Sequence, residues 1–389
     1  MDGARAARSA DVRNSLSHQG RILMKTRLTA GLMTGLALAL ATPAYADVTI
    51  AVVGPMTGSN AVYGGQMRNG VEQAVADINA AGGVNGEKLV LKVGDDACDP
   101  KQAVNVANQM AGEKVKFVVG HYCSGSSIPA SAVYAEEDII EISPASTNPV
   151  FTDKRAGPSI YRICGRDDQQ GAVAGKYIAE NFKGKKVAIL HDKSAYGKGI
   201  ADETLKALQA AGGKETLYEA ITAGEKDYSA LVSKLKQAGV EVIYLGGYHT
   251  EGGLLVRQLR EQGVNAPLIG GDALATSDFW AITGKAGEGT LFTFPPDQRK
   301  LPSAAEVVAK FKAKNFDPQG YTLYSYAAVQ IYADALKAAK SSETEKVLAE
   351  MNKADFKTIV GDVKFDEKGD PTVAGYVFYE FKDGSYVEK

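Results

Sequence analysis

Short apolar strands alternate with amphipathic helices along the chain from Asp47 onward. Residues Val48 to Val53 form a continuous apolar run, and apolar residues then recur at helical spacing from Met67 to Ile78, until Gly82-Gly83. Asp99-Pro100 is typical of a helix start. The same pattern predicts further strands over residues 89–93, 117–119 and 139–142, with helices after Pro100 and after Ser124. Regular alternation of this kind is typical of a parallel sheet covered by helices on both faces.

A second, similar series begins near Tyr161. It predicts helices over residues 168–182, 198–211, 228–238 and 252–262 and strands over residues 187–190, 216–220, 242–245 and 268–269. The last segment predicts helices over residues 304–315 and 323–339, a short helix near Val347, and strands over residues 363–365 and 377–381. We expect an α/β protein with two doubly wound parallel-sheet lobes joined by a hinge of several crossovers. Lobe I is expected to comprise residues 47–165 and 295–372, and lobe II residues 166–294 and 373–389.

Residues 1–46 are predicted to be an N-terminal extension and a signal peptide. Met24 to Arg27 is short and basic, Leu28 to Ala41 is apolar but well short of the ~20 residues that span a bilayer, and cleavage is expected after Ala46. We expect residues 1–23 to precede the true start at Met24. No cysteine stands near Ala46, which argues against a lipid anchor, so the mature protein is expected to diffuse freely in the periplasm.

Charge argues against a nucleic-acid partner. Residues 1–46 carry six of the 44 basic and two of the 46 acidic residues, so the mature chain has a net charge of −6. We expect the mature protein to be a monomer without a cofactor.

The three cysteines are Cys98, Cys123 and Cys164, and an exported chain is expected to bridge two of them. Cys98 and Cys123 each follow a predicted strand, and in a parallel sheet such positions emerge at the same edge. We therefore expect a Cys98–Cys123 disulfide, with Cys164 as a buried thiol.

Polar and small residues follow the predicted strand ends. The stretch from Gly120 to Ser131 ends a strand and opens a helix with several serines and a proline, expected in the first helical turn. Backbone N–H groups and hydroxyls converge at such a helix start, and without a basic residue they suit a small anion such as a carboxylate.

A free amino acid needs donors for its carboxylate, an acid for its ammonium group and a wall for its side chain. Ser124 and Thr147, with the carbonyl of Ala145, are expected to hold the carboxylate and part of the ammonium group, and Asp272 the rest of the ammonium group. Aromatic walls with polar tips are expected from Tyr63, Tyr122, Tyr248 and Tyr321. The alternatives are structural: Ser124, Thr147 and Asp272 could cap helices, and the tyrosines could be ordinary half-buried loop residues.

Catalytic and metal-binding patterns are absent from the sequence. It has no phosphate-binding loop, and Ser233-x-x-Lys236 lies within a predicted helix with apolar residues at helical spacing. His121, His191 and His249 follow strand ends, but their spacing fits no local ligand pattern, so hydrogen-bonded loop histidines are expected instead of a metal site. We therefore expect a binding protein and not an enzyme.

Several long segments resemble the periplasmic leucine/isoleucine/valine-binding proteins of branched-chain amino acid ABC transporters. They are Val52 to Gly58, Glu72 to Ala80, Asp95 to Val104, Gly120 to Ser124, Ile221 to Asp227, Gly246 to His249 and Asp366 to Asp370. The resemblance extends over essentially the whole chain from Asp47. It implies a type I periplasmic-binding fold, capture of an amino acid by closure of two lobes, and delivery to a membrane permease.

Transferred position by position, the family's ligand contacts fall on Tyr63, Ser124, Ala145, Thr147, Tyr248 and Asp272, and its disulfide falls on Cys98 and Cys123. Two residues depart from the family pattern. Asp272 stands where the leucine binders have a glutamate, and Tyr122 stands where a leucine would form an aliphatic wall. The leading hypothesis is therefore a receptor for branched-chain or other aliphatic amino acids. A receptor for an aromatic amino acid, a γ-amino acid or an amide, and a sensory ligand-binding domain, remain alternatives.

Overall fold

A computed structural model describes residues 47–372 and 375–389. The predicted signal peptide, its cleavage site after Ala46 and the expected start at Met24 lie outside these residues. Within the described ranges, no helix is both long enough and apolar enough to cross a membrane.

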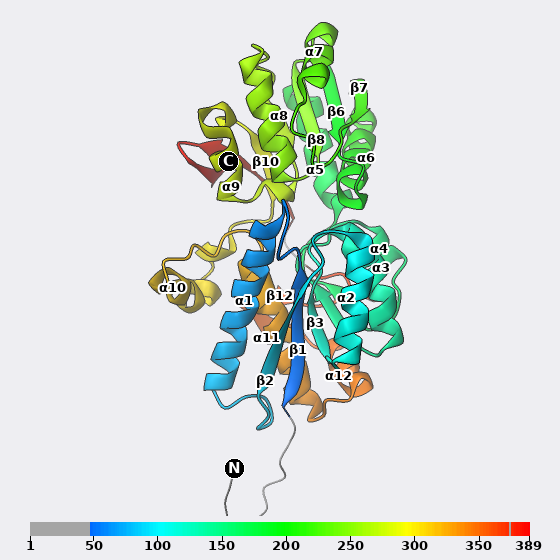
Figure 1. The fold of residues 1–389 in the computed structure, drawn as a ribbon, viewed down its shortest axis with the longest axis vertical. Coiled ribbons are helices and arrows are strands. Elements are labelled where there is room, and N and C mark those ends of the chain that lie inside the picture. Colours follow the sequence, from blue (N-terminus) through cyan, green and yellow to red (C-terminus); the bar gives the residue numbers. More distant parts are fainter. Residues whose placement is uncertain (1–46, 373–374) are drawn as a thin grey trace, which may run out of the picture. The chain divides into compact units, whose positions relative to one another are not determined.

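The first sheet has five parallel strands in the order β2-β1-β3-β4-β5. The strands are β1 (Val48–Gly54), β2 (Leu89–Asp95), β3 (Phe117–Gly120), β4 (Ile140–Ser143) and β5 (Ile160–Arg162). The helices of this part are α1 (Ala61–Ala80), α2 (Pro100–Gly112), α3 (Ser124–Glu136) and the short α4 (Val150–Asp153). Helices α2 and α3 pack together, and α1 packs against α11 (Thr322–Ala339), which comes from much later in the chain (Figure 1).

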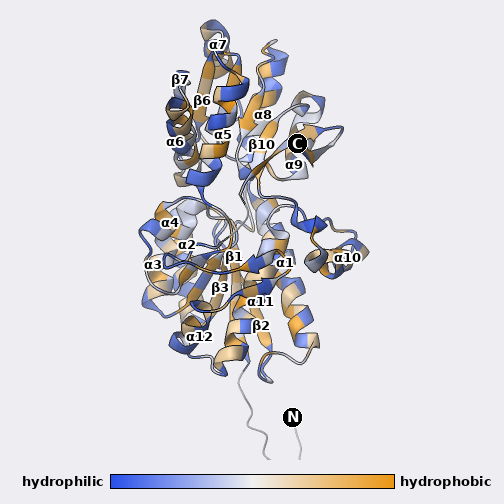
Figure 2. Ribbon diagram, turned by 180° about the vertical axis from the view of Figure 1, so that it is seen from behind, coloured by the Kyte–Doolittle hydropathy of each residue, from blue (hydrophilic) through white to orange (hydrophobic). Residues whose placement is uncertain are grey.

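Alternate residues of β1 face opposite sides of this sheet, as the period of a β-strand requires. Ile50 and Val52 belong to the core cluster that includes residues of α1 and α11, whereas Ala51 and Val53 belong to the cluster under α2 and α3. Apolar residues therefore fill both faces of the strand, and Figure 2 shows hydrophobic strands beneath helices of mixed hydropathy. Because both faces of the sheet are buried, successive residues of the strand are apolar, which explains the continuous apolar run in the sequence.

The second sheet has seven strands in the order β14-β13-β10-β9-β8-β6-β7. Its parallel strands are β6 (Val187–His191), β7 (Glu215–Ala220), β8 (Val242–Gly246), β9 (Leu268–Gly270) and β10 (Leu291–Phe294). Strands β13 (Val377–Lys382) and β14 (Ser385–Glu388) extend the sheet in antiparallel fashion. The helices of this part are α5 (Asp167–Asn181), α6 (Ala195–Ala210), α7 (Ser229–Ala238), α8 (His249–Glu261) and α9 (Ser277–Thr283), with 3₁₀ turns η1 (Asp272–Leu274) and η2 (Gly284–Gly287).

The chain crosses from one sheet to the other more than once. It leaves the first sheet after β5 and leaves the second after β10. It then forms the 3₁₀ turns η3 (Gln298–Lys300) and η4 (Pro302–Ala304), helices α10 (Ala305–Ala313), α11 and α12 (Thr344–Met351), and a separate hairpin of β11 (Phe356–Thr358) and β12 (Gly361–Val363). From there it returns to the second sheet as β13.

Most predicted elements are present, with ends shifted by a few residues. Asp99 caps α2 as predicted, accepting hydrogen bonds from the backbone N–H groups of Lys101 and Gln102 at 2.9 and 2.8 Å. The prediction for Pro129 was wrong: α3 already begins at Ser124, so Pro129 lies beyond the first turn.

The short strands β5 and β10 were not predicted from the sequence, and the start of α6 was predicted three residues late. The second sheet is mixed rather than wholly parallel, because β13 pairs antiparallel with β10 and β14 pairs antiparallel with β13.

The carboxyl ends of the strands determine where functional side chains lie. Tyr122 and Ser124 follow β3, Thr147 follows β4, Tyr248 follows β8 and Asp272 follows β9. In open α/β sheets, ligands bind in the crevice outside these ends.

Candidate functional site

A small cavity of about 10 Å³ lies among these strand-end loops. Residues that follow strands of both sheets line it: Tyr122, Ser124, Ala145, Tyr196, Tyr248, Asp272 and Ala273. This is roughly the space that a single water molecule needs. A larger ligand therefore requires the surrounding loops to move apart.

Five of the eight predicted ligand-binding residues line this cavity, and two of the other three, Tyr63 and Tyr321, contact residues that line it. Tyr63 stacks on Tyr122 with ring centroids 4.3 Å apart, and its hydroxyl donates to the carbonyl of Ala273. Tyr321 donates its hydroxyl to Oδ2 of Asp272. Thr147 is buried, and its hydroxyl has no hydrogen-bond partner among the described residues.

Tyr196 lines the cavity and was missed by the sequence analysis. It lies in the first turn of α6, directly after the end of β6, and Ser194 caps this helix by accepting from the N–H of Gly197 at 2.8 Å. The predicted start of that helix at Lys198 left Tyr196 in a loop. The signal that could have found it is the rule already applied to the other strands, that residues just beyond a strand's carboxyl end face the crevice.

Among the described residues that line the cavity, Asp272 alone has an acidic side chain, and it is 2% exposed. Its Oδ1 accepts hydrogen bonds from Nε2 of Gln170 at 3.0 Å and from the hydroxyl of Tyr196 at 2.8 Å. Burial raises the pKa of this carboxyl, and the hydrogen bonds from Tyr321, Tyr196 and Gln170 act in the opposite direction. No lysine, arginine or histidine of the described residues forms an ion pair with it.

Asp272 therefore does not cap a helix. Thr276 caps α9 instead, accepting from the N–H of Asp278 at 3.2 Å, while Asp272 begins the 3₁₀ turn η1. A buried carboxylate with neutral donors and no cation is an incomplete arrangement electrostatically. It suits a ligand that brings a positive charge.

Ser124 is the first residue of α3, and its hydroxyl accepts from the backbone N–H of Asn148 at 3.3 Å. The capping alternative does not hold for Ser124, because Cys123 occupies the N-cap position and makes no side-chain cap bond. Helix starts offer unpaired N–H groups to anions, so this end of the cavity suits a carboxylate.

Arg162 holds the loop that carries Thr147 in place. The arginine is fully buried, and its guanidinium donates to the carbonyls of Ser146 and Asn148 at 2.5 and 3.0 Å. Asp370 neutralises it, with 2.7 Å between Nε and Oδ1. A buried ion pair with its remaining donors used on backbone carbonyls fixes the loop rigidly.

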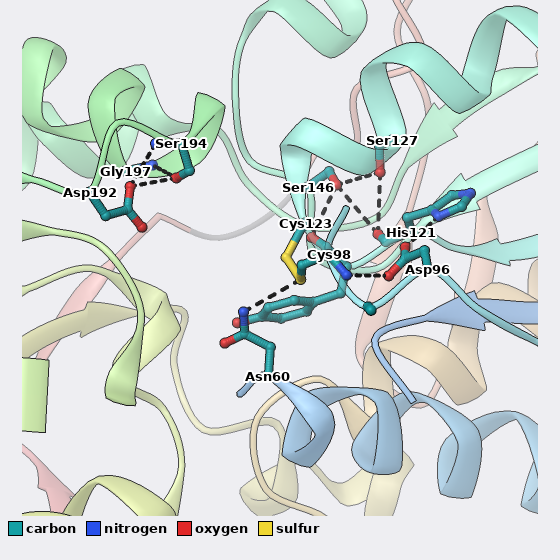
Figure 3. Close-up of a disulfide and its surroundings, with 12 residues drawn as sticks. Asn60, Asp96, Cys98, His121, Cys123, Ser127, Ser146, Asp192, Ser194 and Gly197 are labelled. Atoms are coloured by element: carbon teal, nitrogen blue, oxygen red, sulfur yellow. Dashed lines mark hydrogen bonds and ion pairs between the residues drawn. A yellow bond between two sulfur atoms is a disulfide. The ribbon is translucent and has the colours of Figure 1, made fainter. Parts of the chain in front are cut away.

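The predicted disulfide between Cys98 and Cys123 is present, with a Cα–Cα distance of 5.5 Å (Figure 3). Cys123 stands directly before Ser124, so the bridge anchors the loop that opens α3. Nδ2 of Asn60, the residue before α1, lies 3.5 Å from Sγ of Cys98. Cys164 is the remaining thiol; it is buried, as predicted, and burial raises its pKa, which disfavours the reactive thiolate.

The loop histidines are hydrogen-bonded rather than clustered. His121 is buried, with Nδ1 2.6 Å from Oδ2 of Asp96 and Nε2 3.0 Å from the hydroxyl of Tyr134. His191 accepts from the N–H of Lys193 at 3.1 Å. Nε2 of His249 lies 3.4 Å from the hydroxyl of Thr250. Within the part of the chain that the structure describes, no group of His, Cys, Asp or Glu residues could hold a metal ion.

Direct contacts join the loops of the two sheets around the cavity. Nδ2 of Asn148 donates to the carbonyl of Ala195 at 2.7 Å, and the hydroxyl of Thr250 lies 3.4 Å from the carbonyl of Ser59. The Tyr63 hydroxyl bond to Ala273 is a third such contact. These contacts cover the cavity, which explains how lining residues such as Ser124 and Asp272 are almost fully buried.

Known proteins resemble this chain over nearly its whole length. A family model described as periplasmic binding protein matches residues 47–385. The "Leu/Ile/Val-binding protein homolog 1" of Brucella suis is 51% identical over 363 residues, which cover 93% of this chain and 98% of that protein. An "amino acid binding protein" of Pseudomonas aeruginosa is 49% identical over 353 residues, covering 90% and 94% of the two chains.

Solved structures share the fold. A leucine binding protein, LivK, from Thermotoga maritima has a TM-score of 0.81 at 28% identity, covering 88% of this chain and 97% of that chain. The branched-chain amino acid transporter substrate binding protein LivJ from Streptococcus pneumoniae, in complex with isoleucine, has a TM-score of 0.78 at 28% identity, covering 88% and 100%.

Proposed function

The chain belongs to the periplasmic binding protein family, and on this basis we propose that it captures a free branched-chain or other aliphatic amino acid in the periplasm for an ABC importer. The observation that carries the proposal is Asp272, a buried carboxyl group that lines a small cavity without a cationic partner among the described residues. An ammonium group of the ligand would supply the missing charge.

The two ends of the cavity support opposite roles. Asp272 and the carbonyl of Ala145 accept the ammonium group, and Ser124 and Thr147, at the start of α3 and after β4, bind the carboxylate. The unpaired hydroxyl of Thr147 is available as a donor for that carboxylate. Tyr63, Tyr122, Tyr248 and Tyr321 surround the ligand, and Tyr196 adds a further ring, with its centroid 5.2 Å from that of Tyr248.

We propose that the ligand is bound by closure of two lobes, with the boundaries expected from the sequence: residues 47–165 with 295–372, and residues 166–294 with 373–389. The segments that pass between the two sheets would form the hinge. The loaded monomer then docks on a membrane permease, after export that removes the signal peptide behind Ala46. The similarity to proteins described as leucine/isoleucine/valine-binding supports the ligand class.

Isothermal titration with L-leucine, L-isoleucine, L-valine and L-alanine tests the proposal, with two leucine analogues as sharper probes. Leucinamide lacks the carboxylate and 4-methylpentanoate lacks the ammonium group, so both should bind at least a hundredfold more weakly than leucine. Asp272→Asn should weaken leucine binding by about 2–5 kcal/mol, because it removes one member of a desolvated charge pair.

Asp278→Asn is the matched control, since Asp278 is an exposed aspartate in the first turn of α9. It should leave the affinity unchanged. Equal affinity of the Asp272→Asn variant and the wild type would show that Asp272 does not hold the ammonium group.

A further inference from the structure

Gln170 is a fully buried glutamine in the first turn of α5, and its side-chain hydrogen bonds join it to Asp272 and to Thr293. Its Nε2 donates to Oδ1 of Asp272 at 3.0 Å, and its Oε1 accepts from the backbone N–H of Asp272 at 2.8 Å. Gln170 therefore contacts both the backbone and the side chain of the acid that lines the cavity.

Thr293, on β10, fixes which way the amide of Gln170 points. Its hydroxyl donates to the same Oε1 at 2.7 Å, so this oxygen receives two donors, one of them a backbone N–H that cannot reverse its role. The carbonyl end of the amide must face these donors, and the NH₂ end must face the carboxyl of Asp272. The amide thus presents a donor, not an acceptor, to Asp272.

The hydrogen bonds of Asp272 leave one position for a ligand. A carboxylate oxygen offers about two lone pairs. On Oδ1, Gln170 and Tyr196 use both, whereas Oδ2 accepts a hydrogen bond from Tyr321 alone. Oδ2 therefore keeps an acceptor site, which is what a ligand's ammonium group needs.

We infer that Gln170 is a positioning residue: held by Thr293, it fixes the rotamer of Asp272, occupies Oδ1 and keeps the carboxyl charged, so that Oδ2 receives the ammonium group of the ligand. This inference rests on the proposed function for the identity of the ligand, but the effect of Gln170 on Asp272 exists without any ligand. Asp272 has a shorter side chain than glutamate, and hydrogen bonds at both its backbone and its carboxyl restrict how it can reorient.

Other titratable groups around Asp272 must be separated from this effect. Asp167, at the start of α5, is a second fully buried carboxyl, and its pKa is raised by burial and then by the charge of Asp272. The remaining groups coupled to Asp272 are Cys164 and the tyrosines Tyr63, Tyr122, Tyr196, Tyr244, Tyr248, Tyr321 and Tyr376, whose pKa values are all raised. Asp167 is therefore the group that could titrate in the same acidic range as Asp272.

The test is Gln170→Met, which keeps the length of the side chain and removes the donor. The matched control is Gln169→Met, the same substitution at the neighbouring exposed position of α5. Carbon-13 NMR of labelled aspartate carboxyls, without ligand, measures the pKa of Asp272, assigned with Asp272→Asn and recorded in an Asp167→Asn background. Loss of a charge-assisted hydrogen bond in a buried site should raise this pKa by at least about one pH unit, which is a tenfold change in proton affinity.

Leucine titrations between pH 4 and pH 8 give the second readout. In Gln170→Met the acid side of the affinity profile should move to higher pH, so the loss of affinity should be larger at pH 5 than at pH 8. A general loss of packing would lower the affinity equally at all pH values and would leave the pKa of Asp272 in place, and that result would overturn the inference.

Two further outcomes separate the inference from the proposed function. If leucine does not bind the wild type but Gln170→Met still raises the pKa of Asp272, the role of Gln170 stands and the ligand class is wrong. If leucine binds the wild type and the pKa is the same in Gln170→Met and Gln169→Met, the inference fails alone. Should Gln170→Met not fold, Gln170→Leu removes the same donor and should also raise the pKa; no rise would count against the role.

Discussion

Replacing Cys98 and Cys123 with serine should cost the protein a defined amount of stability. The bridge spans a sequence separation of 25 residues. In the chain-entropy model, closing a loop of this length removes about 12 cal/mol/K from the unfolded chain, or about 3.5 kcal/mol at 25 °C. The entropy of unfolding is about 2 cal/mol/K per residue, so for a mature chain of this length the midpoint should fall by about 5 °C.

The structure also predicts a local effect on binding. Cys123 is the N-cap residue of α3 and stands next to Ser124, and Cys98 contacts Asn60 before α1. Without the bridge, the two loops lose their covalent connection. Leucine should therefore bind more weakly, in addition to the loss of stability. The loss should be about tenfold or less, because the cavity's other residues stay in place.

Differential scanning calorimetry with and without a reductant provides an internal control. Dithiothreitol should lower the melting midpoint of the wild type toward that of the double serine variant and should leave the variant itself unchanged. Thiol titration of the unfolded, unreduced protein should find a single free sulfhydryl, that of Cys164. Three free thiols, or equal midpoints for the oxidised wild type and the variant, would refute the reasoning.

Two further predictions concern buried groups outside the cavity. Neither carboxylate oxygen of Glu141, on β4, makes a hydrogen bond of ordinary geometry among the described residues. Burial raises the pKa of this carboxyl above its ordinary 4.5, and the backbone N–H of His121 acts weakly in the opposite direction. The folded protein favours the neutral acid, so this stabilisation is present below about pH 4.5 and is lost as the pH rises through the raised pKa. The free energy of unfolding of Glu141→Gln should therefore exceed that of the wild type by more than about 1 kcal/mol at pH 8 and equal it at pH 4. A difference that stays constant across pH would contradict this. A Cβ at Gly70 on α1 would lie 2.1 Å from the carbonyl oxygen of Thr322 on α11, so Gly70→Ala should lower the free energy of unfolding in urea by roughly 1–3 kcal/mol. A Cβ at Gly65 would have nothing within 4 Å, so the control Gly65→Ala should be neutral or slightly stabilising. Equal effects of the two substitutions would show that the two helices can separate freely.

Local signals made the elements and several site residues predictable. Apolar runs identified β1 and β3, and Asp99-Pro100 identified the start of α2, because these features depend only on neighbouring residues. The position of Tyr122 and Asp272 followed from the strands before them, since a parallel sheet brings the carboxyl ends of its strands to one edge.

What escaped prediction depends on distant partners. β5 contains Arg162, which reads as a surface residue until Asp370 pairs with it from 208 residues further along. Gln170 likewise reads as an exposed residue of a helix, and only its contacts with Asp272 and Thr293 give it a buried role. Such residues are polar and have no local pattern, so nothing near them in the sequence shows what they bind.

The seven-stranded sheet is completed by the last residues of the chain. β10 pairs on one side with β9, just before it, and on the other with β13, whose residues lie some 85 positions later, and β14 covers the outer edge. Without β13, β10 would present a row of unpaired backbone N–H and C=O groups, because β9 covers only its other side. Removal of β13 and β14 would therefore expose a buried, apolar strand to pairing with other chains, which promotes aggregation.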